Sequence, residues 1–199
     1  MLTKVNVYDL KESIIASGYP MKAHLNDIAK HFPDESDSKR AIALGNRKSN
    51  EGHDNFLAGI LVSFDLTCSI KMWTEFERYH FAQIVSSQST MHRLSKMCID
   101  EVCVPYTDPV IVERLIELQK TYNKTGKEED RFKLLYSCPT GLTLTARVTT
   151  NYRQLKTMYL QRWNHALPEW EDFCEELLHK LPSFEALCLG RGGIEVNGN

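Results

Sequence analysis

Apolar residues recur at helical spacing in the segment from residue 149 to residue 173, which predicts a helix. The apolar positions that share its buried face are Leu155, Met158, Tyr159, Trp163 and Ala166. Arg162 falls on the same face. Because a guanidinium keeps its proton, burying it without a partner would cost several kcal/mol. Arg162 therefore needs a partner, and the sequence leaves two open: an internal carboxylate, such as a glutamate of the last helix, or a ligand.

Similar patterns predict the other elements. Strands are expected where β-branched and apolar residues concentrate, and helices where the spacing is helical and starts at a proline or a turn. The predicted strands are residues 2–10, 55–69 and 142–150. The other predicted helices are residues 21–32, 36–47, 70–81, 109–124, 128–136 and 168–181.

Two segments lack regular patterns. Residues 82–96 are small, polar and serine-rich, which favours a loop or a broken helix, and the tail 190–199 is expected to be loose. Helices outnumber strands and do not alternate regularly with them, so a doubly wound parallel sheet is not expected. The pattern predicts a single α+β domain over residues 1–199, with a mixed sheet packed against helices.

The bulk composition narrows the class of protein. The chain has 199 residues, 42% of them hydrophobic and 25% charged, with a net charge of −2. This balance is typical of a soluble globular domain and lacks the basic excess of a nucleic-acid or membrane-surface binder. No apolar run approaches the roughly 18 residues of a membrane span, and the start lacks the apolar core of a signal peptide. We expect a cytoplasmic protein with no nucleic-acid or membrane partner.

Common catalytic and metal-binding motifs are absent. The six cysteines are scattered without a CxxC pair, and His92, Cys98 and Cys103 do not have a standard zinc spacing, so no metal is expected. The sequence contains no GxxxxGK[ST], no GxGxxG after a strand and no GxSxG. No spacing singles out a serine or cysteine nucleophile.

Polar residues gather at the ends of the predicted elements. Taken singly, each has a structural explanation: an arginine can satisfy helix-end carbonyls, a serine run is usually solvated, and a histidine before a strand often belongs to a turn. Taken together, arginines with small hydroxyl and amide groups suit an anion such as a nucleotide phosphate. The residues of this set are His53, Arg78, Tyr79, His80, Ser86, Ser87, Gln88, Ser89, Arg93, Asn151, Arg153 and Arg162.

The order and spacing of these residues resemble the flavin-dependent thymidylate synthases. The resemblance runs from about Gly52 to Arg93 and from about Pro139 to Leu181. Its first block has a Gly-His before a strand, a helix ending in an R-H-R motif, here Arg-Tyr-His at 78–80, and a serine-containing loop closed by an arginine. In its second block, "TTNYRQLKTMYLQR" is similar to the family's T-x-N-x-R-x-L…L-x-x-R helix.

The resemblance implies a set of site residues. The residues matched to cofactor binding are His53, Arg78, His80, Asn151 and Arg153. The residues matched to substrate binding are Glu75, Ser86, Gln88, Ser89, Arg93 and Arg162. Arg162 is also matched to catalysis, because charge builds on the carbonyl oxygens of the attacked base and a fixed cation there would stabilise the transition state.

The resemblance also implies a reaction and an assembly. The family is α+β and homotetrameric, with FAD held between subunits and the nucleotide stacked on the flavin. Its co-substrates are NADPH and methylene-tetrahydrofolate. The implied function is transfer of a one-carbon unit to C5 of a pyrimidine deoxynucleotide monophosphate, from dUMP to dTMP or to a related methyl or hydroxymethyl product.

Several positions depart from the family pattern. The R-H-R motif keeps only its first arginine, the loop to Arg93 is about three residues longer, and Glu75 replaces a glutamine. Leu135 stands where the family has an arginine, for which Arg131 or Lys133 could substitute. These changes suit a different base, such as cytosine, or a hydroxymethyl product. They also leave a second hypothesis: a catalytically altered homologue that binds nucleotides or has a structural role.

Overall fold

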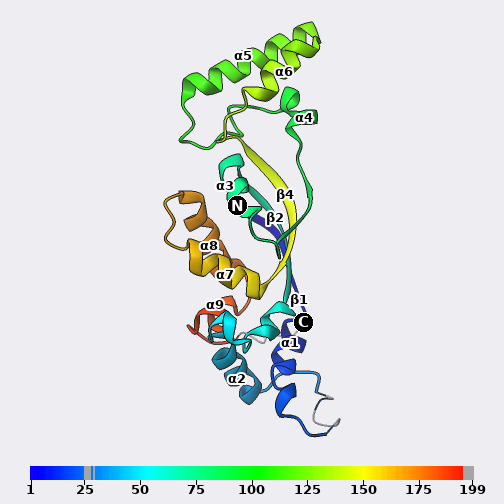
Figure 1. Cartoon of the computed structure of the whole chain (residues 1–199), viewed down its shortest axis with the longest axis vertical. Coiled ribbons are helices and arrows are strands. Elements are labelled where there is room, and N and C mark those ends of the chain that lie inside the picture. Colours follow the sequence, from blue (N-terminus) through cyan, green and yellow to red (C-terminus); the bar gives the residue numbers. More distant parts are fainter. Residues whose placement is uncertain (25–27, 29, 195–199) are drawn as a thin grey trace.

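Four strands form one antiparallel sheet in the order β1-β2-β4-β3 (Figure 1). The structure is a computed structural model that describes residues 1–24, 28 and 30–194. The strands are β1 (Leu2–Tyr8), β2 (Leu61–Ser69), β3 (Gln83–Ser87) and β4 (Thr143–Asn151). The α+β class is confirmed. The expected mixed sheet is wrong, because every pair of neighbouring strands among the described residues is antiparallel.

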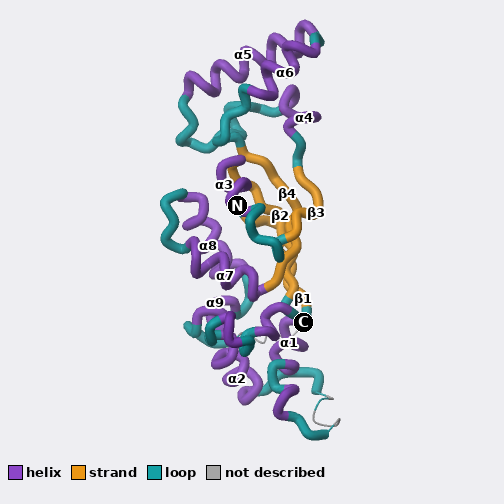
Figure 2. Tube along the Cα trace, viewed as in Figure 1, coloured by secondary structure: helices purple, strands orange, loops and turns teal. Residues whose placement is uncertain are grey.

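The two faces of the sheet differ in chemistry. On β2, Val62, Phe64 and Leu66 are fully buried, while the residues between them are half-buried. Helices α7 and α8 lie on the buried side of the sheet (Figures 1 and 2). The opposite face carries polar pairs between β2 and β4, which are Ser63–Thr149 at 3.1 Å, Asp65–Arg147 at 3.2 Å and Thr67–Thr145 at 2.7 Å. This alternation is the expected result of burying only one side of a pleated sheet.

Helices begin where the sequence supplies a cap. Ser69 ends β2 and its hydroxyl accepts from the N–H of Met72, and Asn151 ends β4 and accepts from the N–H of Gln154. The helices are α1 (Leu10–Ala16), α2 (Glu35–Gly45), α3 (Ile70–Phe76), α4 (Thr90–Arg93), α5 (Pro109–Thr125), α6 (Glu128–Tyr136), α7 (Tyr152–Arg162), α8 (Pro168–Lys180) and α9 (Phe184–Leu189). Short 3₁₀ turns are η1 (Tyr19–Met21), η3 (Ser49–Glu51), η4 (Asn55–Ala58) and η5 (Leu94–Lys96).

The main core contains an aromatic cluster between the sheet and α8. Phe173 packs edge-on against Phe64, Phe76 and Trp170, with ring centroids 6.3, 6.1 and 5.6 Å away. A second, smaller core lies under the α5–α6 hairpin, at the end of the elongated molecule that is uppermost in Figure 1. Its fully buried members include Leu115 and Leu134. No helix among the described residues is long and apolar enough to cross a membrane.

Several predicted boundaries are corrected. The strand expected over 55–69 starts only at Leu61, after a 3₁₀ turn, and the helix expected over 70–81 ends at Phe76. The loop or broken helix expected over 82–96 contains β3, an exposed edge strand that lacks the alternation of a half-buried strand. Helices α1 and α9 were missed because both are short.

Two expectations fall partly on residues that are not described. The helix expected over 21–32 includes residues 25–27 and 29, and the described rest of that range holds no α-helix. The expected loose tail includes residues 195–199, which also lie outside the described residues.

Replacing Phe173 by alanine should destabilise the chain by about 3–5 kcal/mol, because a fully buried ring at the centre of the aromatic cluster would leave a cavity. Phe132→Ala is the matched control, since this ring is 43% exposed on α6 and should cost less than about 1 kcal/mol. Urea unfolding followed by circular dichroism would measure both. Equal effects of the two substitutions would contradict this placement of the core.

Candidate functional site

Arg162, the last residue of α7, has internal partners. Its Nη1 lies 3.0 Å from Oε2 of Glu75 on α3, and its Nε donates to the Tyr79 hydroxyl at 2.9 Å. The guanidinium carbon also lies 4.8 Å from the centre of the Trp170 ring. Of the two partners that the sequence left open, the structure therefore supplies an internal carboxylate, and it comes from α3 rather than from the last helix.

One edge of the guanidinium stays open. Arg162 has a 15% exposed side chain, and its Nη2 makes no hydrogen bond to any described residue. Among the described residues, the buried side-chain polar atoms without a hydrogen bond are Oδ1 of Asp54 and Oγ1 of Thr107. The Nη2 atom of Arg162 is therefore not fully buried and can contact solvent. Arg162 can therefore keep its ion pair with Glu75 and still donate to a ligand through Nη2.

Glu75 is the acceptor that holds this cluster together. Its Oε1 accepts from Lys71 at 2.6 Å, and its Oε2 accepts from both Arg162 and the Trp170 indole at 3.0 Å. The hydrogen bond from Lys71 holds the pKa of the Glu75 carboxyl below its usual value, with a further contribution from Trp170 and against the effect of burial. Glu75 is therefore ionised at neutral pH, and most of its acceptor capacity is used within the chain.

His165 is the residue of this cluster that sequence reasoning missed. Its Nδ1 accepts from the N–H of Leu167 at 3.1 Å. Its Nε2 lies 2.8 Å from Nη1 of Arg162 and 3.5 Å from Oε2 of Glu75. The ring therefore lies directly beside the Glu75–Arg162 ion pair. Trp170 was also missed, because its contact with Glu75 joins elements far apart in sequence.

The segment Arg78-Tyr79-His80 alternates between solvent and core. Tyr79 is buried, accepts from Arg162 and donates to Oε1 of Gln161 at 3.0 Å, whereas Arg78 and His80 are exposed. The tyrosine in the middle of this segment therefore positions Arg162. The two flanking side chains are exposed and make no ion pair with any described residue.

A pocket of about 380 Å³ lies at the other end of α7. Asn151 and Arg153, both expected to bind the cofactor, line it together, with Phe81 at its rim. The Phe81 ring is 73% exposed, and its carbonyl is fixed by a hydrogen bond from Thr150 at 2.9 Å. Arg153 uses Nη2 to donate to the carbonyl of Ser49 at 2.6 Å, while its Nη1 has no partner among the described residues.

A buried carboxylate stands behind this pocket. Asp54 is 0% exposed and lies between Lys156 at 2.9 Å and Nε of Arg153 at 3.1 Å. Burial would raise the pKa of Asp54, but hydrogen bonds from Ser49 and Lys156 outweigh it and hold that pKa below its usual value. His53 precedes Asp54 in an exposed turn and makes no hydrogen bond to the described residues.

The serine loop lies along β3 and α4. Ser86 is exposed and in register with Arg147. Beyond β3, the N–H of Gln88 donates to the carbonyl of Thr145 at 2.9 Å, and the side-chain Oε1 of Gln88 accepts from the N–H of Thr145 at 2.9 Å. The carbonyl of Ser89 accepts from the N–H of Arg93, whose side chain is exposed.

Arg131 is the better candidate for the arginine that Leu135 replaces. Its Nη2 donates to the carbonyl of Met91 in the serine loop at 3.1 Å, and a polar pocket of about 270 Å³ lies between them, lined also by His92 and Lys96. Lys133 instead pairs with Glu129 on its own helix at 2.8 Å.

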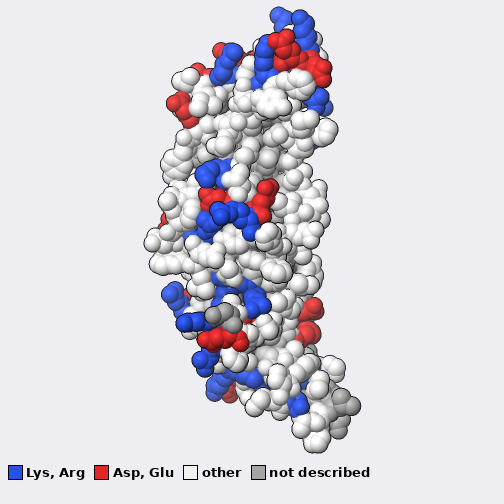
Figure 3. All heavy atoms as spheres, in the orientation of Figure 1, with Lys and Arg blue, Asp and Glu red and all other residues white. Residues whose placement is uncertain are grey.

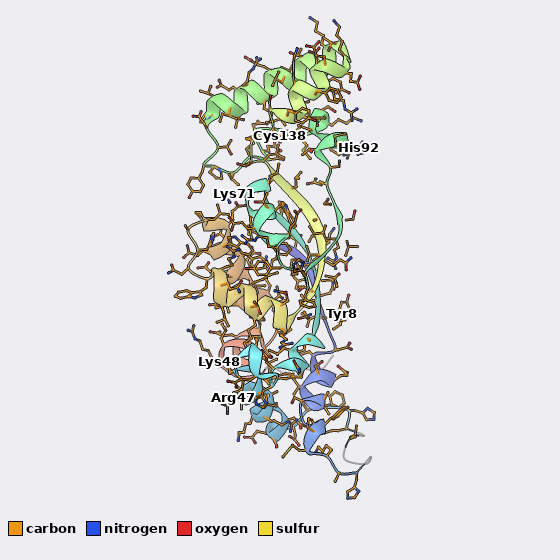
Figure 4. All side chains as sticks on the ribbon, viewed as in Figure 1. Tyr8, Arg47, Lys48, Lys71, His92 and Cys138 are labelled. Atoms are coloured by element: carbon orange, nitrogen blue, oxygen red, sulfur yellow. The ribbon has the colours of Figure 1, made fainter. Side chains whose placement is uncertain are left out.

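The candidate residues form three separate groups on one chain. Ser87 pairs with Ala146, and β4 extends about 17 Å beyond that residue before it reaches Asn151. Arg153 and Arg162 are separated by about 14 Å along α7. Figure 4 shows His92 near the upper end of the molecule and Arg47 and Lys48 near the lower end.

Charged residues gather in separate regions of the surface. On the face shown in Figure 3, lysine and arginine lie with acidic residues at the α5–α6 tip, at the level of α3 and α8, and again at the level of α9 and α2, with mostly uncharged surface between the tip and the level of α3. The structure thus brings together Glu75 with Arg162, Asn151 with Arg153, and the serine loop with Arg131, whereas His53 does not line the pocket of Arg153. It does not bring these three groups together within one chain.

A larger cavity lies elsewhere. It measures about 870 Å³ between the sheet and the loop before α5, and none of the residues matched to cofactor or substrate binding lines it. Lys71 forms part of its wall and connects it to the Glu75 cluster. No cluster of three or more potential metal ligands occurs among the described residues.

The fold is similar to that of solved flavin-dependent thymidylate synthases. One, from Helicobacter pylori and complexed with FAD and dUMP, superposes with a TM-score of 0.72 at 16% identity, covering 94% of this chain and 98% of that one. A second structure of the Helicobacter pylori enzyme with FAD and dUMP gives a TM-score of 0.73 at 16% identity, covering 94% and 97%. No protein-family model and no curated protein sequence matches this chain. The chain therefore has the fold of these synthases.

Replacing Glu75 by glutamine should destabilise the chain by about 1.5–3 kcal/mol at pH 7, because the ion pairs with Arg162 and Lys71 are lost and one of the two acceptor oxygens becomes an NH2 group that faces a cation. The difference between wild type and variant should shrink as the pH falls from 4.5, the usual value for glutamate, through the lowered folded pKa. The direction follows because a carboxyl group whose pKa is lowered on folding stabilises the fold while it is ionised. This stabilisation is lost as the pH falls through the folded pKa.

Urea unfolding between pH 3 and pH 8 would measure this dependence. Glu117→Gln is the matched control, since Glu117 forms an exposed pair with Arg114 at 2.8 Å and should change stability by less than about 1 kcal/mol. A pH-independent difference for Glu75→Gln would show that the carboxylate does not stabilise Arg162.

Proposed function

We propose that this protein is a flavin-dependent transferase that moves a one-carbon unit from methylene-tetrahydrofolate to C5 of a pyrimidine deoxynucleotide monophosphate. The single observation that supports this most is the open Nη2 edge of Arg162, a cation fixed by Glu75 and Tyr79 on an otherwise apolar helix face. The reaction is dUMP to dTMP or a related methyl or hydroxymethyl product, with NADPH as reductant.

The pocket at the start of α7 has the chemistry that a flavin dinucleotide needs. Arg153 offers a free Nη1 to a phosphate, Asn151 offers its amide, and the exposed Phe81 ring offers a face for stacking. At about 380 Å³ the pocket is too small to enclose the whole dinucleotide. When bound, FAD would supply the hydride chemistry that no side chain of this chain can perform.

The serine loop suits the nucleotide phosphate. Arg93 is exposed at the end of α4, and Arg131 reaches the same loop from α6. Phosphate recognition by arginine uses charge-assisted, often paired, hydrogen bonds. Hydroxyl groups from Ser86 and Ser89 add acceptors and donors nearby.

Arg162 would bind the base. Attack through C5 of a pyrimidine builds negative charge on the ring carbonyl oxygens, and a donor fixed beforehand stabilises that charge without reorganising. Tyr79 and Glu75 hold the guanidinium plane, and Trp170 covers one side of it. In this low-dielectric surrounding the electrostatic effect of Nη2 on a developing oxyanion is stronger than in water.

A complete site would require more than one chain. Within one copy the serine loop lies about 17 Å along β4 from Asn151, where the pocket of Arg153 begins, so these two binding groups are far apart on a single chain. The chain also exposes 11902 Å², whereas a compact monomer of this mass exposes about 9,600 Å². The excess is of the size that stable interfaces bury, which supports the homotetramer that the sequence predicts.

The alternative is a catalytically altered homologue that binds nucleotides or has a structural role. The observation in its favour is that the Glu75 carboxylate, matched to substrate binding, already accepts hydrogen bonds from Lys71, Trp170 and Arg162. If the role is structural, Arg162 is a structural cation, and no pyrimidine nucleotide would protect the protein against heat.

The purified protein should be yellow or should become so with FAD, and dUMP or dCMP should raise the melting temperature of the flavin-loaded protein. Arg78→Ala should weaken FAD binding while leaving the fold intact, because this exposed cation has no structural partner among the described residues. Flavin absorbance and thermal shift would measure both. A colourless protein that FAD does not reconstitute, or full FAD occupancy in the variant, would contradict the assignment.

In solution the protein should be a stable oligomer, most simply a tetramer of the 22.9 kDa chain. The reason is the exposed area in excess of that of a compact monomer. Multi-angle light scattering over a tenfold range of concentration would establish the mass. A monomer at all concentrations would contradict both the tetramer and a site shared between chains.

A further inference from the structure

A buried ion-pair cluster that the proposed reaction does not use lies behind the pocket of Arg153. Asp54 is 0% exposed and Lys156 is 3% exposed, and their charged atoms are 2.9 Å apart. Lys156 also donates to the carbonyls of Gly45 at 2.7 Å and Arg47 at 2.6 Å. Burying two charges costs desolvation energy, and the ion pair together with the two carbonyl hydrogen bonds of Lys156 offsets that cost.

The two oxygens of Asp54 have different roles. Oδ2 accepts hydrogen bonds from Lys156 and from the Ser49 hydroxyl at 2.7 Å. Oδ1 forms the ion pair with Nε of Arg153 at 3.1 Å, and no hydrogen bond from the described residues reaches it. Asp54 therefore holds Arg153 by charge, while Lys156 and Ser49 fix the carboxylate itself.

Lys156 also determines how much of the charge of Arg153 is available. Asp54, Lys156 and Arg153 together carry a net charge of +1, because the lysine already neutralises the carboxylate. Arg153 is thus oriented by Asp54 without being fully neutralised by it. Its side chain is 34% exposed, and its Nη1 has no partner among the described residues. This arrangement favours an anion in the pocket.

We propose that Asp54 and Lys156 are positioning residues that orient Arg153 for the phosphate groups of a flavin dinucleotide and fix the turn that carries His53. Asp54 itself is too deeply buried to touch the ligand, so it acts through Arg153. This proposal rests on the proposed flavin binding. It adds Asp54 and Lys156 to the residues that support the flavin pocket, and the sequence pattern identifies neither of them.

The test compares single and double substitutions. Asp54→Asn leaves Lys156 buried without its counter-ion and should lower the melting temperature, as should Lys156→Gln. The double variant D54N/K156Q removes both charges and keeps hydrogen-bonding groups at both positions, so its melting temperature should exceed that of either single variant. Arg153, however, would still lack the charge that orients it.

Flavin affinity separates positioning from stability. Titration with FAD, followed by quenching of flavin fluorescence, should show about tenfold weaker binding for D54N/K156Q than for wild type, since an oriented charge-assisted contact is lost. Asp37→Asn is the matched control, because Asp37 is also buried between two cations, Lys30 and Arg40, but on α2. It should lower the melting temperature and leave FAD affinity within about twofold.

The outcomes distinguish this proposal from the one on which it rests. If wild type binds FAD and the double variant binds it equally well, the cluster only stabilises the fold and the positioning role is wrong. If wild type binds no FAD under any condition, the proposed flavin function is wrong, and the positioning role for a flavin is wrong with it.

Discussion

Strands β2 and β4 pair along their whole length, from Leu61 opposite Asn151 to Ser69 opposite Thr143. Each strand ends in the residue that caps the next helix, so α3 and α7 start at opposite ends of the sheet. The strands span about 27 Å, while α3 and α7 extend about 10 and 16 Å. Because both helices pack on the same face and run towards each other, their C-terminal ends meet. The Glu75–Arg162 contact is a consequence of this antiparallel register.

The parts of the fold that local pattern predicted are those with strong periodicity or a distinct start. Helix α5 begins at Pro109 after the capping residue Asp108, and its position was predicted almost to the residue. Strand β3 was missed because it lies at the sheet edge, where exposed serines are tolerated and burial imposes no alternation. Strand β3 forms because β4 offers it hydrogen-bonding partners, and local sequence carries little information about such a pairing.

For the candidate site, sequence predicted the residues but not their partners. The apolar stripe predicted for this helix is right for Leu155 and Met158, which are buried, and wrong for Trp163 and Ala166, which are exposed and lie beyond the end of α7. Arg162 does have the partner that the stripe required, but the choice of Glu75 depends on the β2–β4 register and cannot be obtained from spacing within α7. The sequence marked Tyr79 only as a departure from the R-H-R motif, whereas in the structure its hydroxyl accepts a hydrogen bond from Arg162. Lys156 had no motif at all. A buried lysine is recognised only when the acceptors around it are known.

Cavity size and chemistry point to different places in this molecule. The cavity of about 870 Å³ has charged groups in its wall, and three of them are already engaged: Lys71 binds Glu75, Glu169 accepts from the hydroxyl and N–H of Ser69, and Asp108 caps α5. Asp172 makes no hydrogen bond or ion pair with the described residues, but it is an anion and would not attract a phosphate. The smaller pocket at Arg153 keeps a free guanidinium nitrogen and an exposed aromatic ring. Ligand recognition needs unengaged donors and acceptors as well as space. The chemistry therefore favours the ends of α7 over the larger cavity.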